Sequence, residues 1–296
     1  MAEDSFFSRI GIFGVGLMGG SLGLALKESG SHSKVIGIGR NSEKLREAQH
    51  LGAIDEWSTE PGSITPPLDL LVVCTPVRRV PEHVRLARPA LAPHSLITDV
   101  GSTKANVVRE SGKAAPTPGQ FIGSHPMAGS HKAGIQAAVP NLYKNRVCVV
   151  TVTDQSSPDA VERITRFWQN LGMYVVQMTP EQHDLLTAFS SHLPHLLAST
   201  LCHTVMDKNS AIEPVLGKGF RDTTRIAAGD ADVWLDICME NRASILESIH
   251  CFRQNLQHLE ELLAHSDESA LFQYLDHARV WKNSLEERKT QIESDE

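Results

Sequence analysis

The chain has 296 residues, 41% of them hydrophobic, which is enough for two domains with a core each. Its 28 lysines and arginines against 35 aspartates and glutamates make it mildly acidic, with no basic face for DNA or RNA. We expect a cytoplasmic protein with no membrane partner and with reduced thiols, because no leader-like or membrane-length apolar run occurs and the five cysteines include no C-x-x-C pair.

The first motif is a glycine-rich turn between an expected strand at residues 10–13 and a leucine-rich helix. It reads G-V-G-L-M-G, a complete G-x-G-x-x-G. In this setting the first glycine makes a tight turn, the second lets the backbone approach a pyrophosphate, and the third lets the helix pack closely on the strand. The helix N-terminus then faces the phosphates. A purely structural turn is the alternative. The residues predicted to bind a dinucleotide here are Gly14, Gly16, Leu17, Met18 and Gly19.

The end of the second expected strand, at residues 35–38, selects between the two nicotinamide cofactors. An aspartate or glutamate there would accept a hydrogen bond from the ribose 2′-hydroxyl and favour NAD. The chain has Gly39 and Arg40 instead, so no carboxylate repels a 2′-phosphate and Arg40 can bind one. The sequence therefore favours NADP, and a solvated Arg40 that leaves NAD acceptable is the alternative.

Strands and helices continue to alternate over the next part of the chain. This alternation predicts an α/β fold with a doubly wound, largely parallel sheet of Rossmann type, whose ligands lie outside the carboxyl ends of the strands. Thr75 and Pro76 follow one such end, and Ser102 and Lys104 follow the next, so we expect all four at the binding edge. The further strands are expected at residues 68–74, 95–100, 121–123, 147–152 and 174–177.

A histidine follows the strand expected at residues 121–123. His125 lies in the run G-S-H-P-M-A-G-S, and an unperturbed imidazole titrates near neutral pH, as a general base requires. A loop histidine is more often an ordinary polar residue. The position of His125 on the same edge as the glycine turn nevertheless favours a catalytic role.

The alternation stops at Thr179 and Pro180, which form a helix start. We therefore expect a dinucleotide-binding domain over residues 1–178 and an all-helical domain over residues 179–296. His192 and His195 lie three residues apart on the first helix, but neither a paired cysteine nor a carboxylate in ligand register accompanies them. We expect no metal site.

Two features of the helical domain point to partners. The glycine-rich turn at residues 217–225 carries Lys218, Arg221 and Arg225, which suit recognition of carboxylates, a solvated turn being the alternative. Apolar residues from Ile245 to Leu263 repeat every three or four positions, and such a stripe needs a partner helix. We expect a homodimer, with a partner helix in the same chain as the alternative.

The later motifs resemble, in order and spacing, those of the prephenate/arogenate dehydrogenases of tyrosine biosynthesis. The resemblance extends from Arg9 to about Leu263 and implies oxidative decarboxylation of prephenate to 4-hydroxyphenylpyruvate with reduction of NAD(P)⁺. The motifs that carry it are Thr98–Lys104, Gly123–Ser130, Ser191–His195 and Gly219–Arg225.

The resemblance also implies roles for individual side chains. His125 takes the proton of the ring 4-hydroxyl, and Ser102 orients His125 and touches the cofactor. Arg225 binds a substrate carboxylate. His195 recognises the pyruvyl side chain, which favours prephenate over arogenate. The substrate contacts it implies are His195, Arg225, Ser124 and Ser130.

One position departs from the family pattern, and two further functions compete. His131 stands where relatives often carry an acidic residue. A 3-hydroxyacid dehydrogenase-like enzyme would resemble its relatives in using a lysine on the interdomain helix, and this chain has only Lys208 at the far end. A dinucleotide sensor without turnover would bind the cofactor and make no demand on His125.

Overall fold

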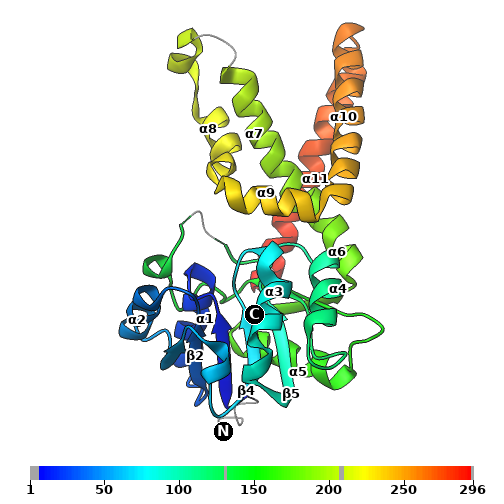
Figure 1. Ribbon diagram of the computed structural model, residues 1–296. Helices are drawn as coiled ribbons and strands as arrows, with labels where there is room; N and C mark the ends of the chain where they lie inside the picture. The colour runs from blue at the N-terminus through cyan, green and yellow to red at the C-terminus, as the bar shows by residue number, and fades with distance from the viewer. Residues whose placement is uncertain (1–6, 130–131, 207–209, 295–296) are drawn as a thin grey trace. The chain divides into compact units, whose positions relative to one another are not determined.

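The computed structural model describes residues 7–129, 132–206 and 210–294 (Figure 1). The chain divides into two compact units, one ending at Ile245 and the other beginning at Leu246, and each is described by itself.

A five-stranded parallel sheet forms the centre of the first unit. Its strand order is β3-β2-β1-β4-β5, and every neighbouring pair runs parallel. The order reverses at β1, so the carboxyl end of β1 is the switch point at which such sheets bind ligands. The doubly wound sheet predicted from the sequence is confirmed. Its strands are β1 (Arg9–Phe13), β2 (Lys34–Ile38), β3 (Glu56–Ser58), β4 (Leu68–Val73) and β5 (Leu91–Asp99).

Helices cover both faces of this sheet, which explains the continuous apolar run of β4. Successive residues of a strand point to opposite faces. Accordingly Leu70 and Val72 belong to a core with α1 and α5, and Leu71 and Val73 belong to a second core with α3 and α4. These helices and their neighbour are α1 (Leu17–Glu28), α2 (Ser42–His50), α3 (Val80–Ala87), α4 (Ala105–Ala114) and α5 (Pro158–Asn170).

A second, three-stranded sheet carries the candidate base. It has the order β6-β7-β8, with β6 antiparallel to β7 and β7 parallel to β8. The strands are β6 (Ser124–Pro126), β7 (Val147–Thr151) and β8 (Tyr174–Met178).

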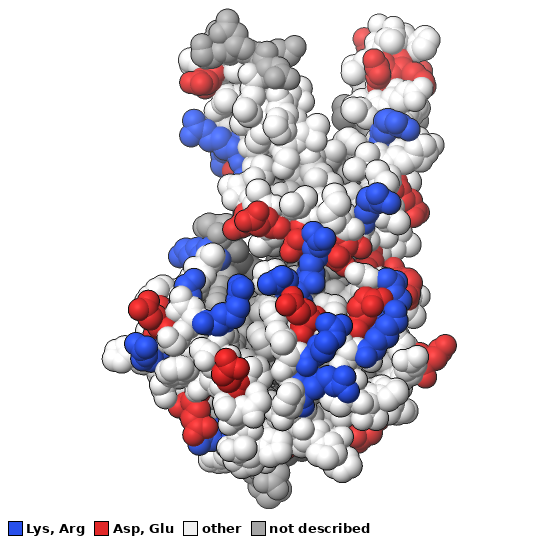
Figure 2. Space-filling model, in the orientation of Figure 1, with Lys and Arg blue, Asp and Glu red and all other residues white. Residues whose placement is uncertain are grey.

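The surface carries charges of both signs. On the face drawn in Figure 2, acidic and basic side chains are interspersed, and no broad area carries one sign alone.

The strand predicted at residues 121–123 is wrong in its bounds. Phe121 makes only an isolated bridge to Ile97, and the paired strand begins at Ser124. His125 therefore lies on β6, opposite Val149 of β7, and not in the loop after a strand. The prediction followed apolar character, which is highest at the buried residues 121 and 122. The strand that forms is instead set by pairing with β7, whose backbone lies opposite residues 124–126. Pro126 is tolerated because β6 is an edge strand.

The helical part begins with a capping box, in which Thr179 and Gln182 each accept from the other's backbone N–H. The single long helix expected from Pro180 is interrupted by a π-helical turn at Ala188–His192, just before Pro194. A proline inside a continuous α-helix loses one hydrogen bond and clashes with the preceding turn, and the π-turn absorbs this misfit. The helices of the first unit here are α6 (Pro180–Thr187), α7 (Leu193–Met206), α8 (Lys218–Thr224) and α9 (Ala231–Glu240).

Two long helices end the chain, α10 (Arg242–Ala264) and α11 (Glu268–Ser294). In the second unit His258 and Tyr274 meet edge to face, with ring centroids 6.0 Å apart. The apolar stripe of α10 begins at Ile245, which is buried, but further along the helix it is exposed in the single chain, where Leu256 is 53% exposed and Leu263 59% exposed. No helix in the described ranges is both long and apolar enough to cross a membrane.

Candidate active site

The glycine turn after β1 is shaped by steric limits. Gly14 has φ +93°, and a Cβ there would lie 2.6 Å from Cγ2 of Thr75. A Cβ on Gly19 would lie 2.2 Å from the carbonyl oxygen of Gly14. Only glycine fits either position, because the backbone of the turn cannot move away from itself. The turn, β4 and the start of α1 thus form one close-packed unit.

The N-terminus of α1 is open to an anion. A Cβ on Gly16 would meet nothing within 4 Å, so this residue faces free space. Gly16 is also the N-cap of α1, no side chain caps the helix, and no acidic residue lies in its first turn. Leu17 and Met18 begin the helix, so their N–H groups have no partner within it. These donors and the helix dipole fit the pyrophosphate of a dinucleotide.

The end of β2 offers cationic side chains. Arg40 is exposed directly after this strand, and a surface pocket is lined by residues 40–44, which include Lys44 and Ser42. Asn41 caps α2 by accepting from the N–H groups of Glu43 and Lys44. The cap holds the start of α2 beside Arg40. At the end of β4, Thr75 Oγ1 lies 2.7 Å from Nδ1 of His83.

A buried ion pair joins the end of β5 to the start of β6. Lys104 and Asp99 are both fully buried, and Lys104 Nζ contacts Asp99 Oδ2. Asp99 also accepts from the N–H groups of Gly101, at 2.8 Å, and Ser124, at 3.1 Å. The hydroxyl of Ser124, itself fully buried, lies 2.7 Å from Thr98 Oγ1. The glycine-serine turn after β5 is thereby tied to the strand that carries His125.

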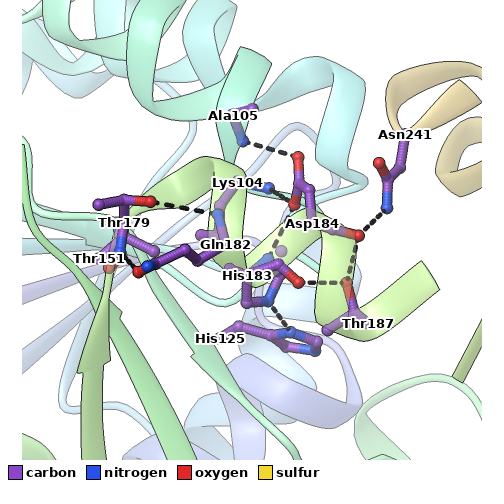
Figure 3. A network of polar contacts seen from close by, with 12 residues as sticks. Lys104, Ala105, His125, Thr151, Thr179, Gln182, His183, Asp184, Thr187 and Asn241 are labelled. Carbon is purple, nitrogen blue, oxygen red and sulfur yellow. Dashed lines mark hydrogen bonds and ion pairs between the residues drawn. The ribbon is translucent and has the colours of Figure 1, made fainter. Parts of the chain in front are cut away.

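His125 lies against a second histidine. Its Nδ1 is 2.8 Å from Nε2 of His183, and the two rings meet nearly edge to face (Figure 3). Burial holds the pKa of His125 well below its usual value, and the nearby His183, Lys104 and His192 lower it further. His125 is therefore neutral at pH 7 and able to accept a proton.

Asp184 attaches this histidine pair to α4. Its carboxylate accepts from the N–H groups of Lys104, at 2.7 Å, and Ala105, at 2.9 Å, at the start of α4. The same carboxylate lies 2.8 Å from Nδ1 of His183. Asn241 donates to the carbonyl oxygen of Asp184 at 2.6 Å (Figure 3). One side chain of α6 thus both caps α4 and orients a ring beside His125.

His195 occupies a separate part of the helical region. Its ring stacks on Trp234 with centroids 3.4 Å apart and an interplanar angle of 10°. A Cβ on Gly229 would lie 2.6 Å from Nε1 of Trp234, so the stack needs glycine at that position. Burial lowers the pKa of His195. Arg225 is exposed at the start of the 3₁₀ turn Arg225–Ala228, which leads to Gly229.

The predicted site residues are brought together only in part. Ser102 is half-buried after β5, but within the described residues no hydrogen bond joins it to His125, whose Nδ1 meets His183 instead. Ser130 and His131 lie outside the described residues. The sequence reasoning gave no role to His183 and Asp184. The signal for them is their place in the helix that begins at Pro180, one turn beyond its cap. In the described ranges, no group of three or more histidine, cysteine or acidic side chains could hold a metal ion.

Comparison with known proteins decides the family. Residues 22–177 match the nucleotide-binding domain of prephenate dehydrogenase, and residues 179–277 match its dimerization domain. The chain belongs to the prephenate dehydrogenase family. It is therefore an oxidoreductase with a nicotinamide dinucleotide cofactor, as the glycine turn and the family resemblance predict.

Individual relatives agree with this assignment. The prephenate dehydrogenase of Bacillus subtilis is 33% identical over 92% of this chain and 74% of its own length. The crystal structure of prephenate dehydrogenase from A. aeolicus with hydroxyphenyl propionate and NAD⁺ has a TM-score of 0.91 at 31% identity, covering 96% of this chain and all of that one. Synechocystis arogenate dehydrogenase has a TM-score of 0.83 at 26% identity, covering 94% and 99%.

Proposed function

We propose that the chain catalyses the oxidative decarboxylation of prephenate to 4-hydroxyphenylpyruvate with reduction of NAD(P)⁺, in the biosynthesis of L-tyrosine. The observation that carries the proposal is a neutral histidine beside the dinucleotide-binding edge. His125 follows a residue whose N–H is bonded to Asp99 at the end of β5, on the edge where the glycine turn also lies. Family membership supplies the substrate class.

His125 acts as the base in this proposal. A nicotinamide held at this edge would supply the acceptor for the hydride that leaves C4 of the substrate. His125 removes the proton of the 4-hydroxyl, so that the C4–O bond gains carbonyl character as the hydride departs. The C–C bond to the ring carboxylate then breaks, its electron pair enters the ring, and CO₂ leaves. The proton returns to the oxygen of the new phenol, so the net reaction releases none.

The substrate's two carboxylates need separate anchors to hold C4 in place. We assign Arg225 to one carboxylate, because its exposed guanidinium can bind an anion in bidentate geometry. We assign His195 to the pyruvyl side chain, and its presence favours prephenate over arogenate. We assign Ser102 to the cofactor and the substrate's 4-hydroxyl, because it follows the end of β5 at the binding edge. For Ser124, which the resemblance implies as a substrate contact, we propose instead a supporting role in β6, because its buried hydroxyl is engaged with Thr98. The predicted role of Ser130 stays a prediction.

We infer a preference for NADP⁺ over NAD⁺. One pocket lies at the end of β2, where the ribose of the cofactor binds in such folds, and its lining has two cations, Arg40 and Lys44, against one carboxylate, Glu43. Asn41 and Ser42 complete it. Gly39 directly follows β2, at the position where an aspartate or glutamate would accept a hydrogen bond from the ribose of NAD. Two cations and a hydroxyl suit a 2′-phosphate. Thr75 and Pro76 at the end of β4 are assigned to the same cofactor.

We further propose that residues 1–178 bind the dinucleotide and that residues 179–296 bind substrate and form a homodimer. The support is the exposed apolar stripe of α10, which includes Leu256 and Leu263, in a region that matches a dimerization domain. An open face of this kind is stabilised by covering it with a partner.

A single assay tests the activity and both preferences. The purified protein is mixed with prephenate or arogenate and with NAD⁺ or NADP⁺, and absorbance of the reduced nicotinamide is followed. The proposal expects the highest kcat/KM for prephenate with NADP⁺. Turnover of arogenate alone would contradict the substrate assignment. Cofactor binding with no turnover of either compound would instead indicate a dinucleotide sensor.

A further inference from the structure

We propose that His183 and Asp184 form a buried relay behind His125, which fixes the reactive tautomer of His125 and holds the substrate's hydroxyl proton until the product takes it back. The proposal rests on the proposed function, because it concerns the proton that this reaction moves. Both residues act through His125 and are positioning residues.

The direction of the hydrogen bonds follows from Asp184. A carboxylate can only accept, so the ring nitrogen that lies 2.8 Å from it, Nδ1 of His183, carries the hydrogen. A neutral imidazole has one N–H, and Nε2 of His183 is therefore an acceptor. The carboxylate is held in place by the two backbone N–H groups of Lys104 and Ala105.

The same reasoning continues to the next ring. Nε2 of His183 lies 2.8 Å from Nδ1 of His125, and an accepting Nε2 requires that Nδ1 of His125 carries the hydrogen. The lone pair of His125 is then on Nε2, the nitrogen away from the relay. Asp184 thus decides, across two rings, which nitrogen of His125 is the base.

Burial keeps both rings neutral before reaction. His125 is faced by His183, Lys104 and His192, and burial with these groups holds its pKa well below the usual value. His183 is faced by Asp184, Lys104 and Asp99, and burial is the main cause of its lowered pKa. When His125 gains a proton, its Nδ1–H can shift toward His183, whose other side meets the Asp184 carboxylate. The new positive charge is then shared near an anion.

The relay can hold a proton but gives it no path to solvent. His183 is 0% exposed and Asp184 is 4% exposed, so its far end is closed to solvent. The net reaction needs no exit, because the proton lost by the 4-hydroxyl is regained by the phenol oxygen. A closed relay that returns its proton matches this balance.

Asp184→Ala tests the relay against a purely structural role. One oxygen of Asp184 accepts from the N–H of Lys104 and also meets Nδ1 of His183, and the other oxygen accepts from Ala105. Alanine removes both oxygens, so nothing fixes the hydrogen of His183 on Nδ1, and His125 is no longer held in the tautomer whose Nε2 accepts a proton. We expect kcat with prephenate to fall by about 10²- to 10⁴-fold. Cofactor affinity should stay within about threefold.

The tautomer is measured directly by NMR of protein with ¹⁵N-labelled histidine, in which the His125 signals are assigned by their loss in His125→Asn. We expect His125 to be protonated at Nδ1 in the wild type and in part at Nε2 in Asp184→Ala. The matched control is Ser157→Ala, which removes the cap of α5 and leaves the relay intact. It should lower stability without changing the tautomer or kcat. If either the tautomer or kcat is the same in Asp184→Ala as in the wild type, the relay is overturned.

His183→Gln keeps the proposal testable if Asp184→Ala fails to fold. Its side-chain oxygen can accept from Nδ1 of His125 but cannot take a proton, and Asp184 still caps α4. We expect an unchanged tautomer with kcat lowered by about 10- to 10²-fold. An unchanged kcat overturns the relay. A wild-type protein that does not turn over prephenate refutes the proposed function instead, and the tautomer readout remains because it needs no substrate.

Discussion

Buried neutral histidines should make the protein less stable as the pH falls, and His192 gives the size of the effect. Its side chain is 1% exposed and accepts a hydrogen bond from Asn241. Burial is the main cause that lowers its pKa to about 4; Asp184 opposes the shift, and His183 and His195 add to it.

The sign follows from proton binding. The unfolded chain has an ordinary histidine pKa of about 6.5, so between pH 6.5 and pH 4 it binds a proton that the folded protein does not. The stability contribution of His192 is fully present above pH 6.5 and is lost as the pH falls toward 4. Between pH 7.5 and pH 5.0 this loss amounts to about 2 kcal/mol for His192 alone.

Urea unfolding at pH 7.5 and pH 5.0, at one fixed protein concentration, measures this loss. In His192→Asn the loss between the two pH values should be smaller than in the wild type by about 2 kcal/mol. The cost of the altered packing cancels, because it is present at both pH values. The control His94→Asn removes an exposed imidazole on β5. Equal losses in His192→Asn and the wild type would refute the assignment of a buried neutral imidazole.

Three further substitutions probe the two binding regions. Gly19→Ala should lower both Tm and cofactor affinity, because its Cβ would meet the carbonyl oxygen of Gly14. Gly16→Ala should keep the wild-type Tm but lower cofactor affinity by about tenfold or more, measured by nicotinamide fluorescence. Arg40→Glu should shift the kcat/KM ratio toward NAD⁺ by about tenfold or more, and an unchanged ratio would contradict the cofactor assignment. Arg225→Ala should raise the KM of prephenate by about 10- to 100-fold, and a defect confined to the cofactor KM would contradict its role.

The features that the sequence predicts well are local ones. The glycine turn and the β4 run depend on residues adjacent in the chain, and their steric and burial reasons act over a few positions. Gly14 and Gly19 show this, because each is limited by backbone within the same turn or the next strand. The parallel order of the sheet follows from the alternation of strands and helices.

The partner of His125 could not be predicted in this way. His183 lies 58 residues further along the chain, and no local pattern tells which side chains that far apart in sequence meet in the fold. Family resemblance pointed to Ser102, which the structure leaves without a hydrogen bond to His125 among the described residues. The limits of β6 were missed because its pairing depends on β7. The π-turn before Pro194 was missed because the periodicity of a helical sequence does not reveal one added residue in a turn.

The central claim is that His125 is the base and that it is not needed to hold the cofactor. His125→Asn tests both parts when prephenate-dependent nicotinamide reduction and cofactor affinity are measured on the same preparation. The account predicts a loss of turnover of about 10²- to 10⁴-fold, with the cofactor Kd within about twofold of the wild type. Turnover close to that of the wild type would contradict it.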